Sequence, residues 1–255
     1  MRMTCRLDGV SPESLDERIV VTDITEQAPE VTRTAVRHAR GGGTLVTEEE
    51  RLSLSVTVKL LVKERHPLRR ALLLERLALW CRGSELRLDS RPGRRLTVRC
   101  EKPLSGGLRG WAEELSVTFT ARAVPYWEEE RERSLTLTDA AEWYIPGTAP
   151  ETAVSFGAEN TGEDTATGLT LKVGDTGLAL DGLLLAPGER VNGTVSEGLL
   201  TLTLQRTDGT RESAAAYLTE DSDDLLMIPC GARTAVSLES DQPMTAVLWA
   251  RGRYL

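Results

Sequence analysis

The segment RLSLSVTVKLLV, residues 51–62, decides the fold class of this 255-residue chain. Its apolar residues alternate with polar ones over most of its length. The apolar face consists of Leu52, Leu54, Val56, Val58 and Leu60. This alternation puts the apolar side chains on one side of an extended strand and Ser53, Ser55, Thr57 and Lys59 on the other. The pattern therefore predicts a long strand with one buried face.

The same period recurs on both sides of one helical segment. Alternation is present in LTVRC, residues 96–100, and in LSVTFTARA, residues 115–123. Between these strands and the first, PLRRALLLERLALWCRG, residues 67–83, has a proline at a helix start and a glycine at its stop. Helical spacing places on one face Leu73, Leu77, Trp80 and Cys81. We expect one amphipathic helix packed on a sheet.

The second half has short strands separated by turn signals. Strands are predicted at residues 169–173, 177–185, 199–204, 214–218, 235–238 and 244–251. Turns are predicted at Gly174-Asp175, Pro187-Gly188, Asn192-Gly193 and Asp208-Gly209. Asn-Gly and Asp-Gly pairs supply the positive φ angles that tight hairpins need. This rhythm is typical of a β-sandwich or jelly roll.

The two halves of the chain differ in net charge. Residues 1–133 contain 24 Lys/Arg and 21 Asp/Glu, or +3, and residues 134–255 contain 7 and 18, or −11, which together give −8. We therefore predict one domain at 1–133 and a second at 134–255. The second repels phosphate and the first is nearly balanced, so nucleic-acid recognition is not expected. The opening segment has no apolar run of the length that a signal peptide needs. No later run approaches the roughly 18 apolar residues of a membrane span, so folding in a cytoplasm is expected.

No pattern of catalytic or metal-binding residues emerges. The sequence lacks GxSxG, GxxxxGK[ST] and HExxH segments, and it has two histidines and four scattered cysteines. Carboxylates cluster at residues 48–50, 128–130 and 221–224, where solvated loops are the expected role. We predict no catalytic, cofactor-binding or metal-binding residues.

Taken in order, the segments resemble the distal tail protein family of siphophages over most of the chain. The resemblance rests on IVVTDITEQAP (19–29), ARGGGTLV (39–46), LALWCRGSELRLDSRPGRRL (77–96), LSVTFTARAVPYWEEE (115–130) and AVLWARGRYL (246–255). It implies a mainly β fold: an N-terminal β-sandwich-like domain with one α-helix and a C-terminal galectin-like β-sandwich, or jelly roll. It also implies a non-enzymatic protein of the virion tail tip, assembled in the bacterial host cytoplasm.

The resemblance further implies a ring of six copies, formed mainly by the first domain. The implied partners are further copies of the chain, the tail tube protein, a tail-tip protein and a receptor-binding protein. Candidate subunit contacts are Arg40, Gly41, Gly42, Gly43, Thr44, Thr57 and Lys59. The glycine run lacks the lysine and the helix of a phosphate cradle, so we interpret it as a loop entering a strand. Strands with open edges are templates for pairing between subunits.

Two other classes of function compete with this hypothesis. A soluble two-domain carbohydrate-binding protein is the alternative, although the second half offers no apparent exposed aromatic platform. Trp127-Glu128-Glu129 invites comparison with a galectin sugar site but lacks the histidine, asparagine and arginine of that signature. A glycan hydrolase is the third class, and it requires a catalytic carboxylate that no motif identifies.

Overall fold

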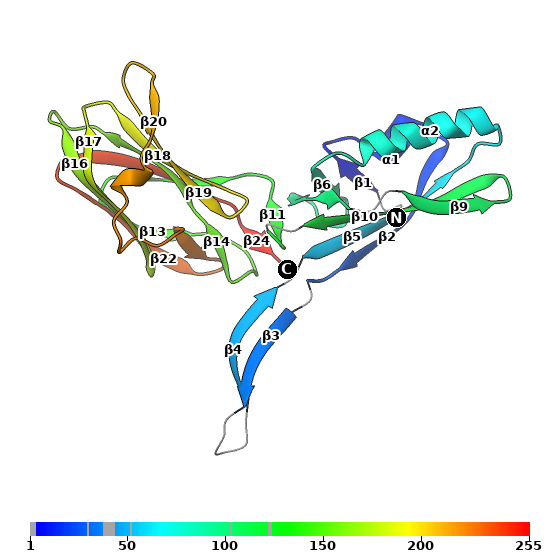
Figure 1. Cartoon of the computed structure of the whole chain (residues 1–255), viewed down its shortest axis with the longest axis horizontal. Coiled ribbons are helices and arrows are strands. Elements are labelled where there is room, and N and C mark those ends of the chain that lie inside the picture. Colours follow the sequence, from blue (N-terminus) through cyan, green and yellow to red (C-terminus); the bar gives the residue numbers. More distant parts are fainter. Residues whose placement is uncertain (1–3, 30, 38–43, 52, 102–103, 122–123) are drawn as a thin grey trace. The chain divides into compact units, whose positions relative to one another are not determined.

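The computed structural model describes residues 4–29, 31–37, 44–51, 53–101, 104–121 and 124–255. Its contacts divide the chain into two compact units, Met1–Trp127 (unit 1) and Glu128–Leu255 (unit 2). Figure 1 shows both units to be built mainly of strands. The expected mainly β fold class is confirmed. The boundary between residues 133 and 134 and the galectin-like character of the second domain stay predictions.

Unit 1 contains two antiparallel sheets, a separate two-stranded ribbon and two helices. One sheet has the order β2-β5-β10-β8, with β9 added to β10; the second joins β1, β6 and β7; β3 pairs with β4. The elements are β1 (Cys5–Leu7), α1 (Pro12–Leu15), β2 (Ile19–Gln27), β3 (Val31–Arg37), β4 (Thr44–Arg51), β5 (Leu54–Val62), α2 (Pro67–Trp80), β6 (Glu85–Leu88), β7 (Arg94–Thr97), β8 (Arg99–Cys100), β9 (Ser105–Arg109), β10 (Ala112–Ala121) and the first residue of β11 (Trp127–Glu129).

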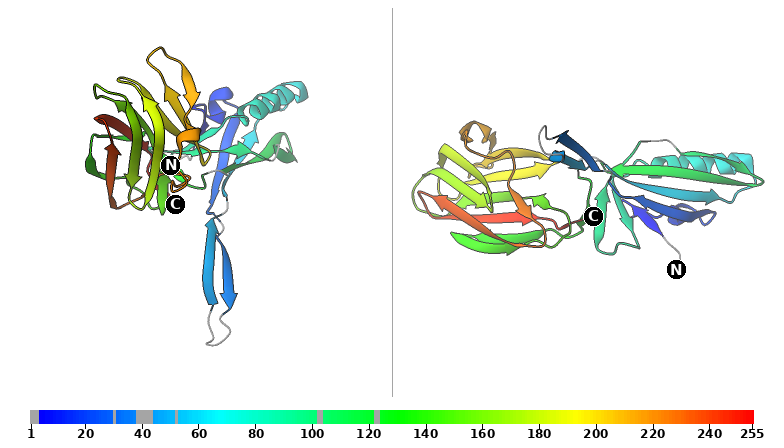
Figure 2. Two further views of the ribbon diagram at one scale, coloured as in Figure 1. Left: turned by 60° about the vertical axis from the view of Figure 1, so that its left-hand side comes forward. Right: turned by 90° about the horizontal axis from the view of Figure 1, so that it is seen from below.

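Strand β5 is the centre of unit 1, because β2 and β10 pair with it on its two sides. Its side chains alternate between buried and partly exposed positions, and the exposed fractions of Val56, Val58 and Val62 are all 0%. Helix α2 covers the buried face of this sheet (Figure 2). The ring centroids of Trp80 and Phe119 lie 5.7 Å apart in an edge-to-face arrangement that joins α2 to β10.

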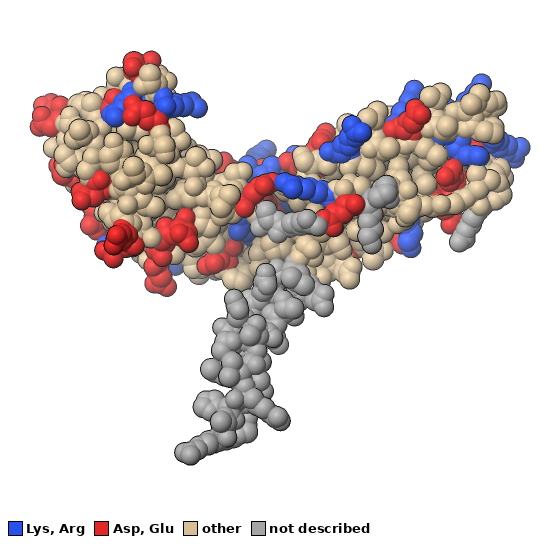
Figure 3. All heavy atoms as spheres, viewed as in Figure 1, with Lys and Arg blue, Asp and Glu red and all other residues tan. Residues whose placement is uncertain are grey.

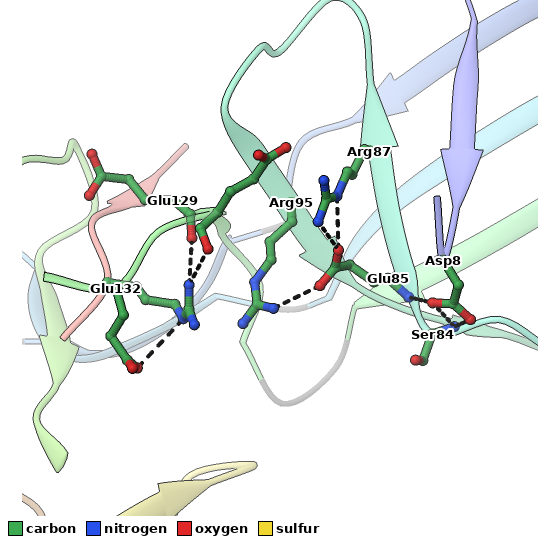
Figure 4. Close-up of polar contacts among 9 residues, drawn as sticks. Asp8, Ser84, Glu85, Arg87, Arg95, Glu129 and Glu132 are labelled. Atoms are coloured by element: carbon green, nitrogen blue, oxygen red, sulfur yellow. Dashed lines mark hydrogen bonds and ion pairs between the residues drawn. The ribbon is translucent and has the colours of Figure 1, made fainter. Parts of the chain in front are cut away.

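The ends of α2 follow from local sequence. Pro67 occupies the first turn, where its missing N–H costs nothing. Beyond the helix, the carboxylate of Asp8 accepts the backbone N–H of Ser84 at 3.2 Å and of Glu85 at 2.9 Å (Figure 4). These bonds anchor the chain as it enters β6. The predicted helix is therefore confirmed, with its last residue at Trp80.

Glu85 on β6 forms ion pairs with two arginines, Arg87 on the same strand and Arg95 on the neighbouring strand β7. Its carboxylate lies 2.6 Å from a guanidinium nitrogen of Arg87 and 2.7 Å from one of Arg95 (Figure 4). Burial acts to raise the pKa of Glu85, but the hydrogen bonds from both arginines outweigh it and lower that pKa. Of these two pairs, only the pair with Arg95 joins β6 to β7, since Arg87 lies on β6 together with Glu85.

Unit 2 is a sandwich of two antiparallel sheets. Their orders are β12-β23-β15-β18-β19-β20 and β13-β22-β16-β17, and β14 pairs with β21. The elements are β12 (Arg133–Leu137), β13 (Ala140–Tyr144), β14 (Glu151–Ala153), β15 (Ser155–Asn160), β16 (Ala166–Val173), β17 (Thr176–Leu185), β18 (Arg190–Ser196), β19 (Leu199–Gln205), β20 (Arg211–Ser213), η1 (Ala215–Tyr217), β21 (Met227–Pro229), β22 (Arg233–Ser240), β23 (Met244–Ala250) and β24 (Arg253–Tyr254). A single apolar core fills the space between the sheets, with contributions from both.

The predicted turn at Asn192-Gly193 is wrong, because both residues lie inside β18. Gly193 faces Phe156 across the strand pair, and a Cβ at position 193 would lie 2.2 Å from the phenyl ring. The glycine therefore serves close packing of the ring, a use that the dipeptide alone does not distinguish from a turn. By contrast, Gly174, Gly188 and Gly209 have positive φ angles between strands, as predicted.

Other local predictions also need correction. Residues 51–62 are not one strand: β4 ends at Arg51 and β5 begins at Leu54. The predicted strand 214–218 is the 3-10 helix at Ala215–Tyr217. Unit 1 has a second, four-residue helix, α1, which begins where Ser11 Oγ accepts the N–H of Ser14. Such single-turn elements carry no hydrophobic period from which to recognise them.

We predict that Leu77→Ala destabilises the protein by about 2–5 kcal/mol, the usual cost of a cavity at a buried leucine. Leu77 is 0% exposed and lies on the core side of α2. The matched control is Leu79→Ala on the outer side of the same helix, where 61% of the residue is exposed. Chemical denaturation of unit 1 measures both, and equal costs would contradict the packing described.

A second prediction concerns the stability of the fold at low pH. The hydrogen bond from Arg18 lowers the pKa of Asp16 to about 2, so Asp16 stabilises the fold above its unfolded-state pKa of about 4, and this contribution is lost as pH falls through about 2. Asp16→Asn should therefore lower the melting temperature at pH 7. The difference between variant and unaltered chain should shrink steadily as pH falls from 4 to 2, and a difference independent of pH would contradict it.

Candidate assembly surface

Helix α2 carries a second apolar side that no part of unit 1 buries. We call Leu68, Leu72 and Leu79 the leucine stripe; they are 73%, 57% and 61% exposed. Their spacing of four and seven residues puts them on one side of the helix, opposite Leu73 and Leu77. Sequence reasoning found only the inner side. The outer leucines were visible as a second periodic set, but the arginines between them favoured a solvated face.

A further apolar side chain lies near the start of α2. Trp111, at the turn between β9 and β10, is 49% exposed. The guanidinium of Arg65 lies 5.3 Å from the centre of its ring, a cation–π contact, and Arg65 precedes α2 by two residues. The ion pair of Arg70 with Glu113, at 3.3 Å, joins the same two regions. The turn and the helix start are thus held together.

A groove of 530 Å³ lies at the other end of α2. Its lining includes Ala78, Cys81, Val98, Cys100 and Leu104. Burial raises the pKa of the Cys81 thiol to about 12, so this thiol is neutral and presents an apolar surface. The groove adjoins the leucine stripe, because Ala78 of the groove and Leu79 of the stripe are consecutive residues of α2. Exposed apolar surface of this kind marks sites of protein contact.

Charge surrounds these apolar residues. Arg69 and Arg76 on α2 are exposed, and Figure 3 shows basic side chains gathered over the helix. The apolar contacts therefore have a basic rim, and an acidic partner surface would complement it.

The residues predicted as subunit contacts fall into two groups. Arg40, Gly41, Gly42 and Gly43 lie outside the described residues. Thr44 begins β4 and pairs with Arg37 of β3. Their role in contacts between subunits stays a prediction.

Thr57 and Lys59 lie on the side of β5 that faces away from the core. The hydroxyl of Thr57 is 3.0 Å from that of Thr118, and Lys59 Nζ lies 2.9 Å from a carboxylate oxygen of Asp23. The hydrogen bond from Lys59 lowers the pKa of Asp23. Both predicted residues thus have partners within the sheet, and a second subunit would meet a row of hydroxyls and one ion pair.

The described carboxylates at 128, 129 and 223 have partners that do not suit an acid–base pair, and the side chains at 48–50 lie outside the description. Glu128 lies 3.2 Å from Arg253, and Glu129 lies 2.8 Å from Arg133. The hydrogen bond from Arg133 lowers the pKa of Glu129, the opposite of what a general acid needs. Trp127 is fully buried beneath Arg91 and presents no surface to a sugar. Asp223 accepts the N–H of Gly177 at 2.7 Å.

Metal ligation and membrane insertion find no support among the described residues. No group of three or more His, Cys, Asp or Glu residues among them could hold a metal ion. None of their helices combines the length and apolarity that crossing a bilayer requires.

The fold is that of phage tail hub and baseplate proteins. In particular, 98% of this chain superposes on 99% of the SPP1 Dit protein, described as a paradigm of the hub adsorption apparatus in phages that infect Gram-positive bacteria, with a TM-score of 0.74 and 15% identity. A chain of the phage P2 baseplate in its activated conformation with Ca matches 99% of this chain over 98% of its own length, with a TM-score of 0.52 and 8% identity. No family model matches the sequence, and no curated protein is significantly similar to it.

If unit 1 self-associates through the stripe, Leu68→Glu should weaken that association markedly, because a charge replaces an apolar contact. Loss of a central apolar contact typically costs about 2 kcal/mol or more of binding. The control is Leu199→Glu in unit 2, since Leu199 has the same exposed fraction, 73%. Sedimentation velocity measures association, and circular dichroism checks the fold. Equal association of the two variants would contradict this role of the stripe.

Proposed function

We propose that this chain is a structural protein of a long-tailed phage, the distal tail hub, which forms a ring of six copies. The ring would join the tail tube to the tail-tip protein and to receptor-binding proteins. The observation that carries this proposal is the likeness of fold to a phage hub protein along 98% of the chain. Fold alone does not define function, so the surfaces of the chain must support it.

The leucine stripe supports an assembling role. A ring needs heterologous contacts, in which one patch of a subunit meets a different patch of the next. The stripe and the adjoining groove of 530 Å³ give unit 1 one apolar patch with a pocket that a neighbour's side chain can fill. The complementary patch includes, in this proposal, the segment from Arg40 to Thr44 together with Thr57 and Lys59.

Strand edges support the same role. The order β2-β5-β10-β8 makes β2 an edge strand, and β3 pairs with β4 in a ribbon of two strands. Edge strands offer backbone N–H and C=O groups for pairing with another chain. A hub that must contact tube, tip and its own copies needs several such surfaces.

The proposed hub has no catalytic role. The ion-paired Glu128 and Glu129 and the lowered pKa of Glu129 give acid–base chemistry no support. Its place would be the virion tail tip, after assembly in the bacterial host cytoplasm. The acidic second half, with its −11 charge, gives no support to nucleic-acid binding.

We predict that light scattering after size exclusion gives a mass near six times the 27.9 kDa of one chain, with dissociation on dilution. A typical interface buries about 800 Å² on each partner, so a ring with modest contacts depends on concentration. Negative-stain images should then show a particle with a central hole. A strict monomer at every concentration, unchanged when the tail tube protein is added, would contradict the proposal.

A further inference from the structure

A groove of 420 Å³ crosses the outer face of the six-stranded sheet of unit 2. Its lining includes the polar residues Glu132, Asn192, Thr203, Gln205 and Arg211 and the apolar residues Phe156, Val195 and Trp249. These side chains come from the segment before β12 and from β15, β18, β19, β20 and β23, which Figure 1 labels in part. Binding sites for small ligands have volumes of roughly 300–1,000 Å³. The groove is large enough for such a ligand.

The strand register brings the groove residues together. Asn192 stands opposite Thr203 on the β18–β19 pair, and Gln205 stands opposite Arg211 on the β19–β20 pair. Their neighbours along each strand, such as Leu204, point into the core of the sandwich. Period-two alternation therefore aligns polar groups from several strands on the outer face. Because they lie on paired strands, their spacing is fixed.

Gly157 leaves room between the side chains of Asn192 and Trp249. It pairs with Asn192, and a Cβ at position 157 would lie 2.9 Å from Asn192 Oδ1 and 3.3 Å from Cη2 of Trp249. A side chain there would fill the gap between the amide and the indole. The indole of Trp249 is half-buried, so part of its surface remains open.

The polar groups of the groove are available to a ligand. Within the described residues, the side-chain amides of Asn192 and Gln205 and the guanidinium of Arg211 have no hydrogen-bond or ion-pair partner. Glu132 lies 3.7 Å from Arg251 and keeps further acceptor capacity. Side-chain amides both donate and accept, and a guanidinium donates in a fixed fork. Such groups match pairs of neighbouring hydroxyls.

We propose that this groove binds a short, uncharged saccharide. The C–H face of a pyranose would lie on the indole of Trp249, where its apolar contact is favourable. The hydroxyls of the sugar would bond to Asn192, Gln205 and Arg211. The charge of −11 over residues 134–255 disfavours an anionic polymer. The lining contains Phe156, Val195 and Trp249 but is otherwise mostly polar, which favours a ligand rich in hydroxyls over an apolar protein side chain.

The saccharide site does not rest on the proposed hub function. A hub could form its ring with no ligand in unit 2, and unit 2 could bind a sugar in a monomeric chain. The two proposals therefore have separate readouts: mass in solution for the ring and ligand titration for the groove.

The test is titration of the full chain with neutral tetrasaccharides of glucose, galactose, rhamnose and N-acetylglucosamine. Binding is measured by calorimetry and by the change in tryptophan fluorescence. At least one should saturate with a dissociation constant of about 1 mM or tighter. Trp249→Ala should weaken that binding at least about tenfold, a loss of about 1.4 kcal/mol. Val247→Ala, on the same side of β23 but outside the groove, is the matched control and should bind normally.

Two outcomes overturn the proposal: saturation by none of the four saccharides, or unchanged binding in Trp249→Ala. If Trp249→Ala loses its folded circular dichroism spectrum, Asn192→Ala replaces it, with the same expected direction. A poly(glycerol phosphate) control should bind no better than the neutral sugars, and tighter binding of that polymer would also overturn the proposal. The solution mass of Trp249→Ala should equal that of the unaltered chain.

Discussion

Burial of one side of β5 is the constraint on which unit 1 depends. Since β2 and β10 pair with β5 on its two edges, the apolar side chains of three strands form one surface. That surface must be covered, and α2 covers it through Trp80 and Phe119. A shift of one residue in the pairing of β5 would expose Val56 and Val58 and bury Thr57 and Lys59. The register therefore fixes both the helix position and the polar side of the sheet.

Sequence reasoning recovered the elements whose periods are long and unbroken. Strand β10 and helix α2 were predictable because each repeats its pattern over several turns or pairs. It failed at Asn192-Gly193, where the packing of Phe156, which is distant in the sequence, determines the role of the glycine. The groove of unit 2 was equally inaccessible, because its side chains come from separate strands and only the pairing register unites them.

The two units present different kinds of surface. Unit 1 exposes three leucines in a row along α2, whereas the groove on the outer sheet of unit 2 gathers amides, hydroxyls and a partly exposed indole. Apolar stripes favour contact with protein, whereas fixed polar groups around an aromatic ring favour a small hydrated ligand. The two proposals, assembly through unit 1 and ligand binding by unit 2, therefore rest on different surfaces.

The burial of two cysteines in unit 1 has a consequence for their oxidation. Burial raises the pKa of Cys5, like that of Cys81, to about 12. Oxidation and disulfide exchange proceed through the thiolate, which is scarce at such pKa values. Both thiols are therefore slow to oxidise in air, even though Cys81 lines a groove. The shelf life of the folded protein would depend on the packing that keeps these thiols protonated.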